Sequence, residues 1–127
     1  MATSAQYAAT SRTAVALIST ANTNRNGSGT IVTVFSAGAS GSRVDDVTIQ
    51  STGTVTAGAV RLYLYNGTTH FMIREVLVTA TTPSTTVQAW NSSFTNLGLI
   101  LQNGWSLTAS TNNAESFNVA VTRAGDF

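Results

Sequence analysis

The chain has 127 residues, of which 9% are charged, and its six cationic side chains are all arginine. A typical soluble domain has about 25% charged residues, so this chain has few charges to keep its surfaces apart in solution. The net charge of +1 excludes the basic face of a nucleic-acid-binding protein, and the absence of cysteine excludes disulfides and thiolate chemistry.

The chain opens with small and polar residues that include one aromatic, Tyr7, and one cation, Arg12. We expect residues 1–13 to form an N-terminal arm that orders against a partner, and residues 14–127 to form a single domain. The apolar run 14–18 is too short to span a bilayer and has too few upstream cations for a secretion signal. We therefore expect a soluble protein that is not exported by a classical signal.

From residue 14 onwards, apolar and polar residues alternate with a period of two, as in β-strands with one buried face. Strands are expected at Val15–Ile18, Ile31–Phe35, Val44–Gln50, Val60–Tyr65, Phe71–Val78 and Val87–Phe94. A short apolar stretch follows at Leu97–Leu101, and two more strands at Trp105–Ala109 and Phe117–Val121. In the third strand, Val47 and Ile49 share the face expected to be buried. If Val44 also lies inward, together with Asp46, a bulge is needed before Val47.

The pair Asn66-Gly67 separates two of these segments and predicts a hairpin, because Asn-Gly supplies the two positive-φ positions of a type I′ turn. No segment has a convincing helical period. About eight short strands separated by turns predict an all-β protein, an antiparallel β-sandwich of the jelly-roll kind.

The candidate catalytic groups do not form a reactive set. His70 has no recognisable nucleophile motif near it and is interpreted as a surface histidine beside the turn. Asp45 and Asp46 are neighbours on a strand and point to opposite faces, so we expect them, like Glu75, to be solvated or paired with arginine. Asn22, Asn24 and Asn26 offer only neutral amides and are interpreted as turn residues instead of calcium ligands. No catalytic residue, metal or cofactor is assigned.

The aromatic residues divide into two groups. Phe35, Phe71, Trp105 and Phe117 occupy the expected apolar faces and are predicted to be core. Tyr63, Tyr65 and Trp90 lie opposite core positions or beside polar runs. Exposed aromatics of this kind stack on sugars or anchor a protein interface, and a neighbouring loop can equally cover them.

The C-terminal half contains short strings that resemble small structural proteins of tailed bacteriophages. A strand ends in Asn66-Gly67-Thr68, an Arg-Glu strand contains Arg74-Glu75-Val76, a Gly-Trp-Ser-Leu strand follows at 104–107, and a Glu-Ser-Phe-Asn-Val strand closes the pattern at 115–119. The resemblance covers about residues 43–123. It implies a part of the virion, such as a head decoration (cement) protein or a tail component.

The leading hypothesis is therefore a non-enzymatic virion protein that binds the outside of a phage head as a homo-oligomer, with a trimer favoured and the major capsid protein or another virion protein as partner. Such a protein is made in the host cytoplasm and resides in the virion, and neither nucleic acid nor membrane is an expected partner. Its candidate interface residues are Tyr7, Arg12, Tyr63, Tyr65, Trp90 and Phe127. The alternatives are a carbohydrate-binding or receptor-binding tail module that uses Tyr63, Tyr65 or Trp90, and a sandwich-type glycosidase or lyase.

Overall fold

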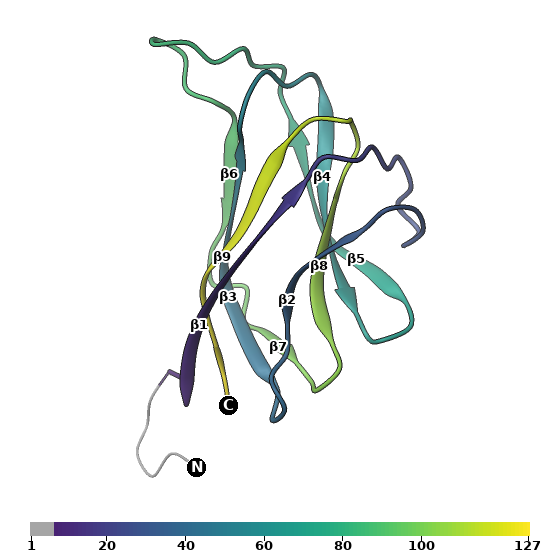
Figure 1. The fold of residues 1–127 in the computed structure, drawn as a ribbon, viewed down its shortest axis with the longest axis vertical. Coiled ribbons are helices and arrows are strands. Elements are labelled where there is room, and N and C mark those ends of the chain that lie inside the picture. The colour runs from purple at the N-terminus through teal and green to yellow at the C-terminus, as the bar shows by residue number, and fades with distance from the viewer. Residues whose placement is uncertain (1–6) are drawn as a thin grey trace.

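A computed structural model describes residues 7–127, which form nine β-strands and no helix. The described part therefore contains no helix that could cross a membrane. The strands lie in two layers and run along the long axis of the molecule (Figure 1). They are β1 (Thr10–Ile18), β2 (Val32–Ser36), β3 (Ser42–Ser51), β4 (Gly58–Tyr65), β5 (His70–Val78), β6 (Asn91–Phe94), β7 (Leu99–Leu101), β8 (Ser106–Thr111) and β9 (Phe117–Asp126).

The strands form two antiparallel sheets. The first sheet has the order β1-β9-β3-β6, with β7 also paired to β3, and the second has the order β2-β8-β4-β5. Strands β6 and β7 pair with opposite ends of β3 and so act as one interrupted edge strand, which accounts for nine strands where about eight were expected. The predicted all-β antiparallel sandwich is confirmed. The chain crosses between the two sheets several times, and the only consecutive strands that share a sheet are β4 with β5 and β6 with β7. The jelly-roll path stays a prediction.

The core lies between the sheets, as the alternation in β3 and β9 predicted. Val47, Ile49, Val119 and Val121 are all buried. The register of β3 against β9 shifts on both sides of Asp46, so the bulge expected between residues 44 and 47 is present. It lets β3 bury both Val44 and Val47, although a regular strand would point them to opposite faces.

Val15, Leu17 and Phe71 are apolar side chains of the strands that are exposed, and one of them, Phe71, was predicted to be core. Ile18 is the fully buried residue of β1, so the period of two turns Val15 and Leu17 outward, where they are 67% and 56% exposed. Phe71 lies on the free edge of the second sheet, at the start of β5, and is 53% exposed. The sequence period located these strands, but it did not identify the inward face of β1, and the edge position of β5 was not visible in it.

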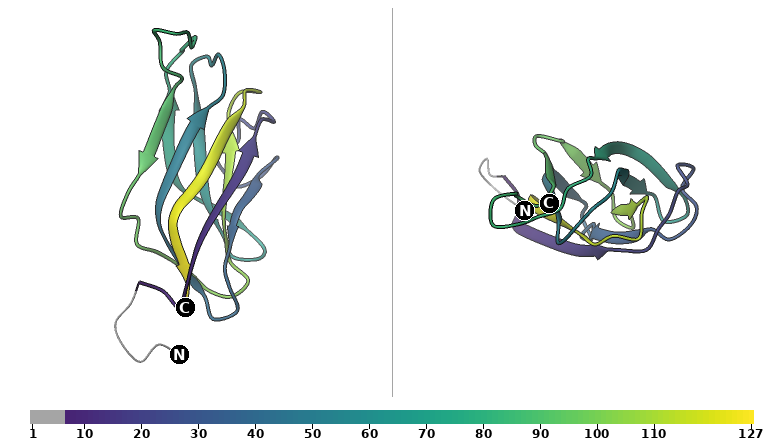
Figure 2. Two further views of the ribbon diagram at one scale, coloured as in Figure 1. Left: turned by 60° about the vertical axis from the view of Figure 1, so that its left-hand side comes forward. Right: turned by 90° about the horizontal axis from the view of Figure 1, so that it is seen from above.

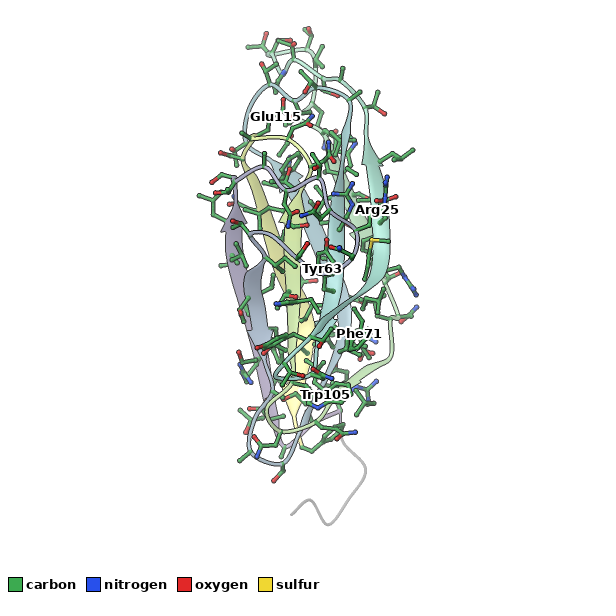
Figure 3. All side chains as sticks on the ribbon, turned by 90° about the vertical axis from the view of Figure 1, so that its right-hand side faces the viewer. Arg25, Tyr63, Phe71, Trp105 and Glu115 are labelled. Atoms are coloured by element: carbon green, nitrogen blue, oxygen red, sulfur yellow. The ribbon has the colours of Figure 1, made fainter. Side chains whose placement is uncertain are left out.

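The second sheet is buried on both faces in its central strands. Every residue of β8 is buried, and so are Arg61 and Tyr63 of β4. The connection between β1 and β2, residues 19–31, covers the outer face of this sheet. The backbone amide of Asn22 donates to the carbonyl of Thr111 at 2.8 Å. Figure 3 views the molecule from this side and labels Tyr63.

The hairpin between β4 and β5 is confirmed, but its turn differs from the expected one. Tyr65 pairs with His70, so the loop has four residues, and of its first two only Gly67 has a positive φ, at 97°. The side-chain oxygen of Asn66 accepts hydrogen bonds from the backbone amides of Thr68 and Thr69. This Asx-type arrangement holds the turn without the two positive-φ residues of a type I′ turn.

Strand β1 begins at Thr10, so the expected boundary between arm and domain at residue 13 falls inside the sheet. Ala9 donates its amide to the carbonyl of Asp126, which continues the pairing of β1 with β9 towards the N-terminus. The start of β1 and the end of β9 therefore lie together at one end of the sandwich (Figures 1 and 2). Residues 1–6 of the expected arm lie outside the described residues.

A pair of glycine substitutions tests the packing of the covering connection. Gly27 has a φ of 87°, and a Cβ there would overlap the carbonyl oxygen of His70, whereas Gly53 has open space around it. We expect Gly27→Ala to lower the free energy of unfolding by roughly 1–3 kcal/mol and Gly53→Ala to leave it unchanged or slightly raised. Urea unfolding followed by circular dichroism measures both; equal effects would show that the connection is not packed on β5.

Candidate functional site

The outer face of the first sheet is an open surface of the molecule. Strand pairing places outward side chains in two transverse rows across β1, β9, β3 and β6, which lie side by side in Figure 2 (left). The first row is Leu17, Asn118, Gln50 and Asn91, and the second is Val15, Ala120, Thr48 and Ser93. We call these eight residues the neutral face, because none of them is charged.

The neutral face follows from the same alternation that builds the core. Thr48 and Gln50 point outward because Val47 and Ile49 point inward, and Asn118 and Ala120 do so because Val119 and Val121 are buried. None of the eight was predicted to be an interface residue, although the alternation of Thr48 and Gln50 with buried residues was the signal that could have identified them.

Charged groups gather on the same sheet at its other end, around the bulge of β3. Asp45 is the extra residue of the bulge and is only 2% exposed. Its Oδ2 accepts hydrogen bonds from the Tyr7 hydroxyl at 2.6 Å and from Arg43 Nε at 3.0 Å, and Arg123 Nη2 lies 3.5 Å away. The guanidinium of Arg43 stacks 4.4 Å from the centre of the Tyr7 ring. This cluster fastens the segment before β1 to the sheet.

The electrostatics of the cluster keep Asp45 ionised. Burial by itself raises the pKa of Asp45, but the Tyr7 hydroxyl and the guanidinium groups of Arg43 and Arg123 outweigh it, so the pKa lies below its usual value of 3.8. Burial and the neighbouring Asp45 carboxylate raise the pKa of the Tyr7 hydroxyl. A carboxylate with so many donors is a poor proton acceptor, which favours a fastening role over general base chemistry.

Arg12 and Phe127, two further predicted interface residues, lie at the same end. Arg12 Nη1 contacts Asp126 Oδ1 at 2.7 Å and the Ser36 carbonyl at 3.1 Å, and its guanidinium lies 4.3 Å from the centre of the Phe35 ring. The Phe127 amide donates to the Gly41 carbonyl at 3.1 Å, while half of the residue's surface stays exposed. Arg12 is thus engaged within the chain, and Phe127 is open to a partner.

A shallow pocket of about 260 Å³ lies beside Tyr7 on the outer side of β1 and β9, lined by Tyr7, Ser11, Arg12, Thr13, Thr122, Arg123 and Ala124. Small-molecule sites usually have volumes of roughly 300–1,000 Å³. Both arginines of the lining already contact carboxylates. The pocket therefore offers neither the depth nor an unpaired cation for a small anionic ligand.

The central charged group of the second sheet is Arg61, which is 1% exposed. Its Nε contacts Glu75 Oε2 at 2.7 Å, its Nη1 donates to the Asn22 carbonyl at 3.0 Å, and its Nη2 donates to Asn112 Oδ1 at 3.1 Å. Glu75 also accepts a hydrogen bond from Arg25 at 2.8 Å. One guanidinium thereby joins the covering connection, β5 and the turn after β8.

The three predicted surface aromatics do not form a common platform. Tyr63 is fully buried beneath the connection, and its hydroxyl contacts the Asn24 carbonyl and Ser110 Oγ, which agrees with the alternative that a neighbouring loop covers it and leaves it unavailable to a partner. Tyr65 stacks on His70 with ring centres 4.2 Å apart. Trp90 packs edge-on against Phe117 and precedes β6 of the other sheet. Rings on different sheets cannot stack on one sugar.

The other candidate groups are accounted for within the fold. His70 is half-buried, its Nδ1 lies 3.0 Å from Thr108 Oγ1, and burial lowers its pKa; it is thus less exposed than a surface histidine. Glu75 and Asp45 are paired with arginine, as predicted. Asn22 donates to the carbonyls of Ser28 and Thr30, which agrees with its interpretation as a turn residue. Among residues 7–127, no group of three or more acidic or histidine side chains is placed to hold a metal.

Comparison with known proteins does not assign the chain to a family. No protein-family model and no curated protein matches the chain. Among solved structures, a chain of the cyanophage Pam1 capsid asymmetric unit overlaps it with a TM-score of 0.45 and 16% sequence identity, over 98% of this chain and 89% of that one. At that TM-score the overlap is partial, and nothing about the function of this chain follows from it.

The buried guanidinium gives a first test of this architecture. Arg61→Met removes the charge and leaves the Asn22 carbonyl and the Asn112 side chain without their donor. We expect the free energy of unfolding to fall by about 3–5 kcal/mol, whereas Arg74→Met, on the exposed side of β5, should change it by less than about 0.5 kcal/mol. Denaturant unfolding compares the two, and a mild effect of Arg61→Met would refute its role in holding the connection.

The paired carboxylates make the free energy of unfolding depend on pH. Hydrogen bonds from Arg25 and Arg61 hold the pKa of Glu75 below its usual value of 4.5. A depressed folded-state pKa contributes stability that is present above the usual value and is lost as the pH falls through the folded-state value. We expect the free energy of unfolding to decline below pH 4.5, and Glu75→Gln to be less stable at pH 7 with a shallower decline. Unfolding curves from pH 7 to pH 2.5 measure both; parallel profiles would contradict the assignment.

Proposed function

We propose that this chain is a non-enzymatic structural protein of a tailed-phage virion, and specifically a decoration protein that binds the outer surface of the head as a homo-oligomer. The phage-like strings of the sequence support the proposal. They fall on strands of both sheets: Asn66-Gly67-Thr68 forms the β4–β5 turn, Arg74-Glu75 lies in β5, and residues 104–107 and 115–119 lead into β8 and β9.

The observation that carries the proposal is the neutral face. Burying a charged group costs several kcal/mol unless it is well paired, and the eight residues of this face present no such cost. Val15 and Leu17 supply apolar area, which contributes roughly 1.5–3 kcal/mol for each side chain that is fully buried. A broad, pleated and uncharged surface suits a protein that adheres to a larger body.

The neutral face is too small to act alone. Two rows across four strands cover on the order of 300 Å² when strands are ~4.8 Å apart and rows ~7 Å apart, whereas a stable interface buries about 800 Å² on each partner. The remaining contact area must come from neighbouring surfaces. The chain ends, including the exposed Phe127, are our candidates for it.

A matched pair of variants tests the face. Leu17 lies on it, and Leu77 is exposed on β5 outside it. We expect wild type to form an oligomer, a trimer by preference, at micromolar concentration, and Leu17→Asp to weaken association at least tenfold because it buries a charge in the contact. Leu77→Asp should behave as wild type. Size-exclusion chromatography with light scattering measures the masses; a monomeric wild type, or equal effects of the two variants, would contradict the proposal.

The location on the particle needs a second experiment. A cryo-EM map of the phage particle whose genome encodes this chain should show the sandwich on the outer head surface, with the first sheet turned towards a neighbouring subunit. Density for the chain in the tail alone would reject decoration and keep a virion role, and a particle without the chain would reject both.

A further inference from the structure

Three Asn-Gly pairs occur in the chain, at 26–27, 66–67 and 103–104. The asparagine of such a pair can deamidate without an enzyme, because a glycine has no Cβ to shield its backbone nitrogen from the preceding side chain. In this reaction the backbone nitrogen of the glycine attacks the side-chain carbonyl carbon of the asparagine. That carbon must therefore be able to turn towards the nitrogen. The surroundings of the three pairs differ, so their reactivities should differ too.

The first two pairs are locked. Asn26 Oδ1 accepts hydrogen bonds from the Ser28 amide and hydroxyl, at 3.2 and 2.6 Å. The backbone of Gly27 is packed against the carbonyl of His70, which leaves no room for a Cβ. Asn66 Oδ1 accepts three hydrogen bonds, from the Thr68 amide, the Thr68 hydroxyl and the Thr69 amide, at 2.9–3.0 Å. Each side chain would have to break these bonds before it could react.

The third pair is free. Asn103 is exposed, and its side chain makes no hydrogen bond to any residue between 7 and 127. Its turn is closed by a bond from the Trp105 amide to the Gln102 carbonyl at 2.9 Å, in which the Gly104 amide takes no part. The surroundings of Gly104 are open, with nothing within 4 Å of a would-be Cβ.

We propose that Asn103 is a site of spontaneous, water-dependent deamidation in the folded protein, and that the fold protects Asn26 and Asn66. The Gly104 nitrogen loses its proton to solvent base and bonds to Cγ of Asn103. The Cγ–Nδ2 bond breaks, Nδ2 leaves as ammonia, and a cyclic imide forms. Water then opens the imide at Cγ to give aspartate, or at the main-chain carbonyl to give isoaspartate. No oxidant or reductant takes part.

The modification has a large electrostatic effect on this chain. The new carboxylate lowers the formal net charge from +1 to zero. Proteins near zero net charge associate more readily. The isoaspartate product also lengthens the main chain by one carbon inside the tight turn before β8. Slow deamidation at Asn103 would thus change the charge of one end of the sandwich with time.

Peptide mapping by mass spectrometry in H₂¹⁸O tests the proposal. Folded wild type is held at pH 8.5 and 37 °C, and the same chain in urea serves as the unfolded reference. We expect Asn103 to convert at least tenfold faster than Asn26 and Asn66 in the folded protein, and the three to convert within about threefold of one another in urea. Equal rates in the folded protein, or faster conversion at Asn26 or Asn66, would overturn the proposal. So would an Asn103 that stays intact while the unfolded chain reacts.

Two variants separate the site from general ageing. Asn103→Gln should abolish the acidic species that accumulates on isoelectric focusing, since the longer side chain closes the ring poorly. Asn66→Gln should leave that species unchanged. If both variants still accumulate it at the wild-type rate, the charge change arises elsewhere and the assignment to Asn103 fails.

Discussion

The hydrogen bonds of the buried Arg61 guanidinium decide which faces of this molecule are open to solvent. The guanidinium joins the 19–31 connection to β5 and to the turn after β8 through Asn22, Glu75 and Asn112. With the connection held in place, the outer face of the second sheet is shielded from solvent, and the central residues of β4 and β8 are buried on both sides. Within residues 7–127, no connection covers the outer face of the first sheet in this way. The two layers of the sandwich are therefore unequal, and only one of them presents a broad pleated surface.

The few charges of the sequence are concentrated where the chain is fastened. Five of the six arginines contact carboxylates: Arg12, Arg25, Arg43, Arg61 and Arg123. The sixth, Arg74, donates to its own neighbour's carbonyl on the exposed side of β5. These contacts lie at one end of the first sheet or join β5 to the connection and to β4. The low charge content thus reflects a fold that uses ionic groups for internal attachment and leaves the rows of the neutral face without them.

The period of two predicted the strands well, because each strand has at least one face against the core and its pattern is local. Val47 and Ile49 could be assigned to the core from their neighbours alone. Tyr63 and Arg61 could not, because their burial depends on a connection some forty positions earlier in the chain. A bulge at Leu62/Tyr63 also shifts the hairpin register, so that Arg61 faces Glu75. The alternation cannot reveal that pairing. Phe71 was misplaced because an edge strand has one side without a neighbour, a property of sheet order.

The neutral face is also prepared for burial by its own hydrogen bonds. An unsatisfied polar group costs about 1–3 kcal/mol when it is buried, so amides and hydroxyls on a contact surface normally require partners across it. Here Thr48 Oγ1 and Ser93 Oγ lie 3.3 Å apart, and Gln50 Nε2 donates to the carbonyls of Ser51 and Trp90. Part of the hydrogen-bonding need of this face is therefore met within the chain. A partner therefore needs a matching shape more than a matching set of donors, and this explains how a surface with only two large apolar side chains could serve the proposed adhesive role.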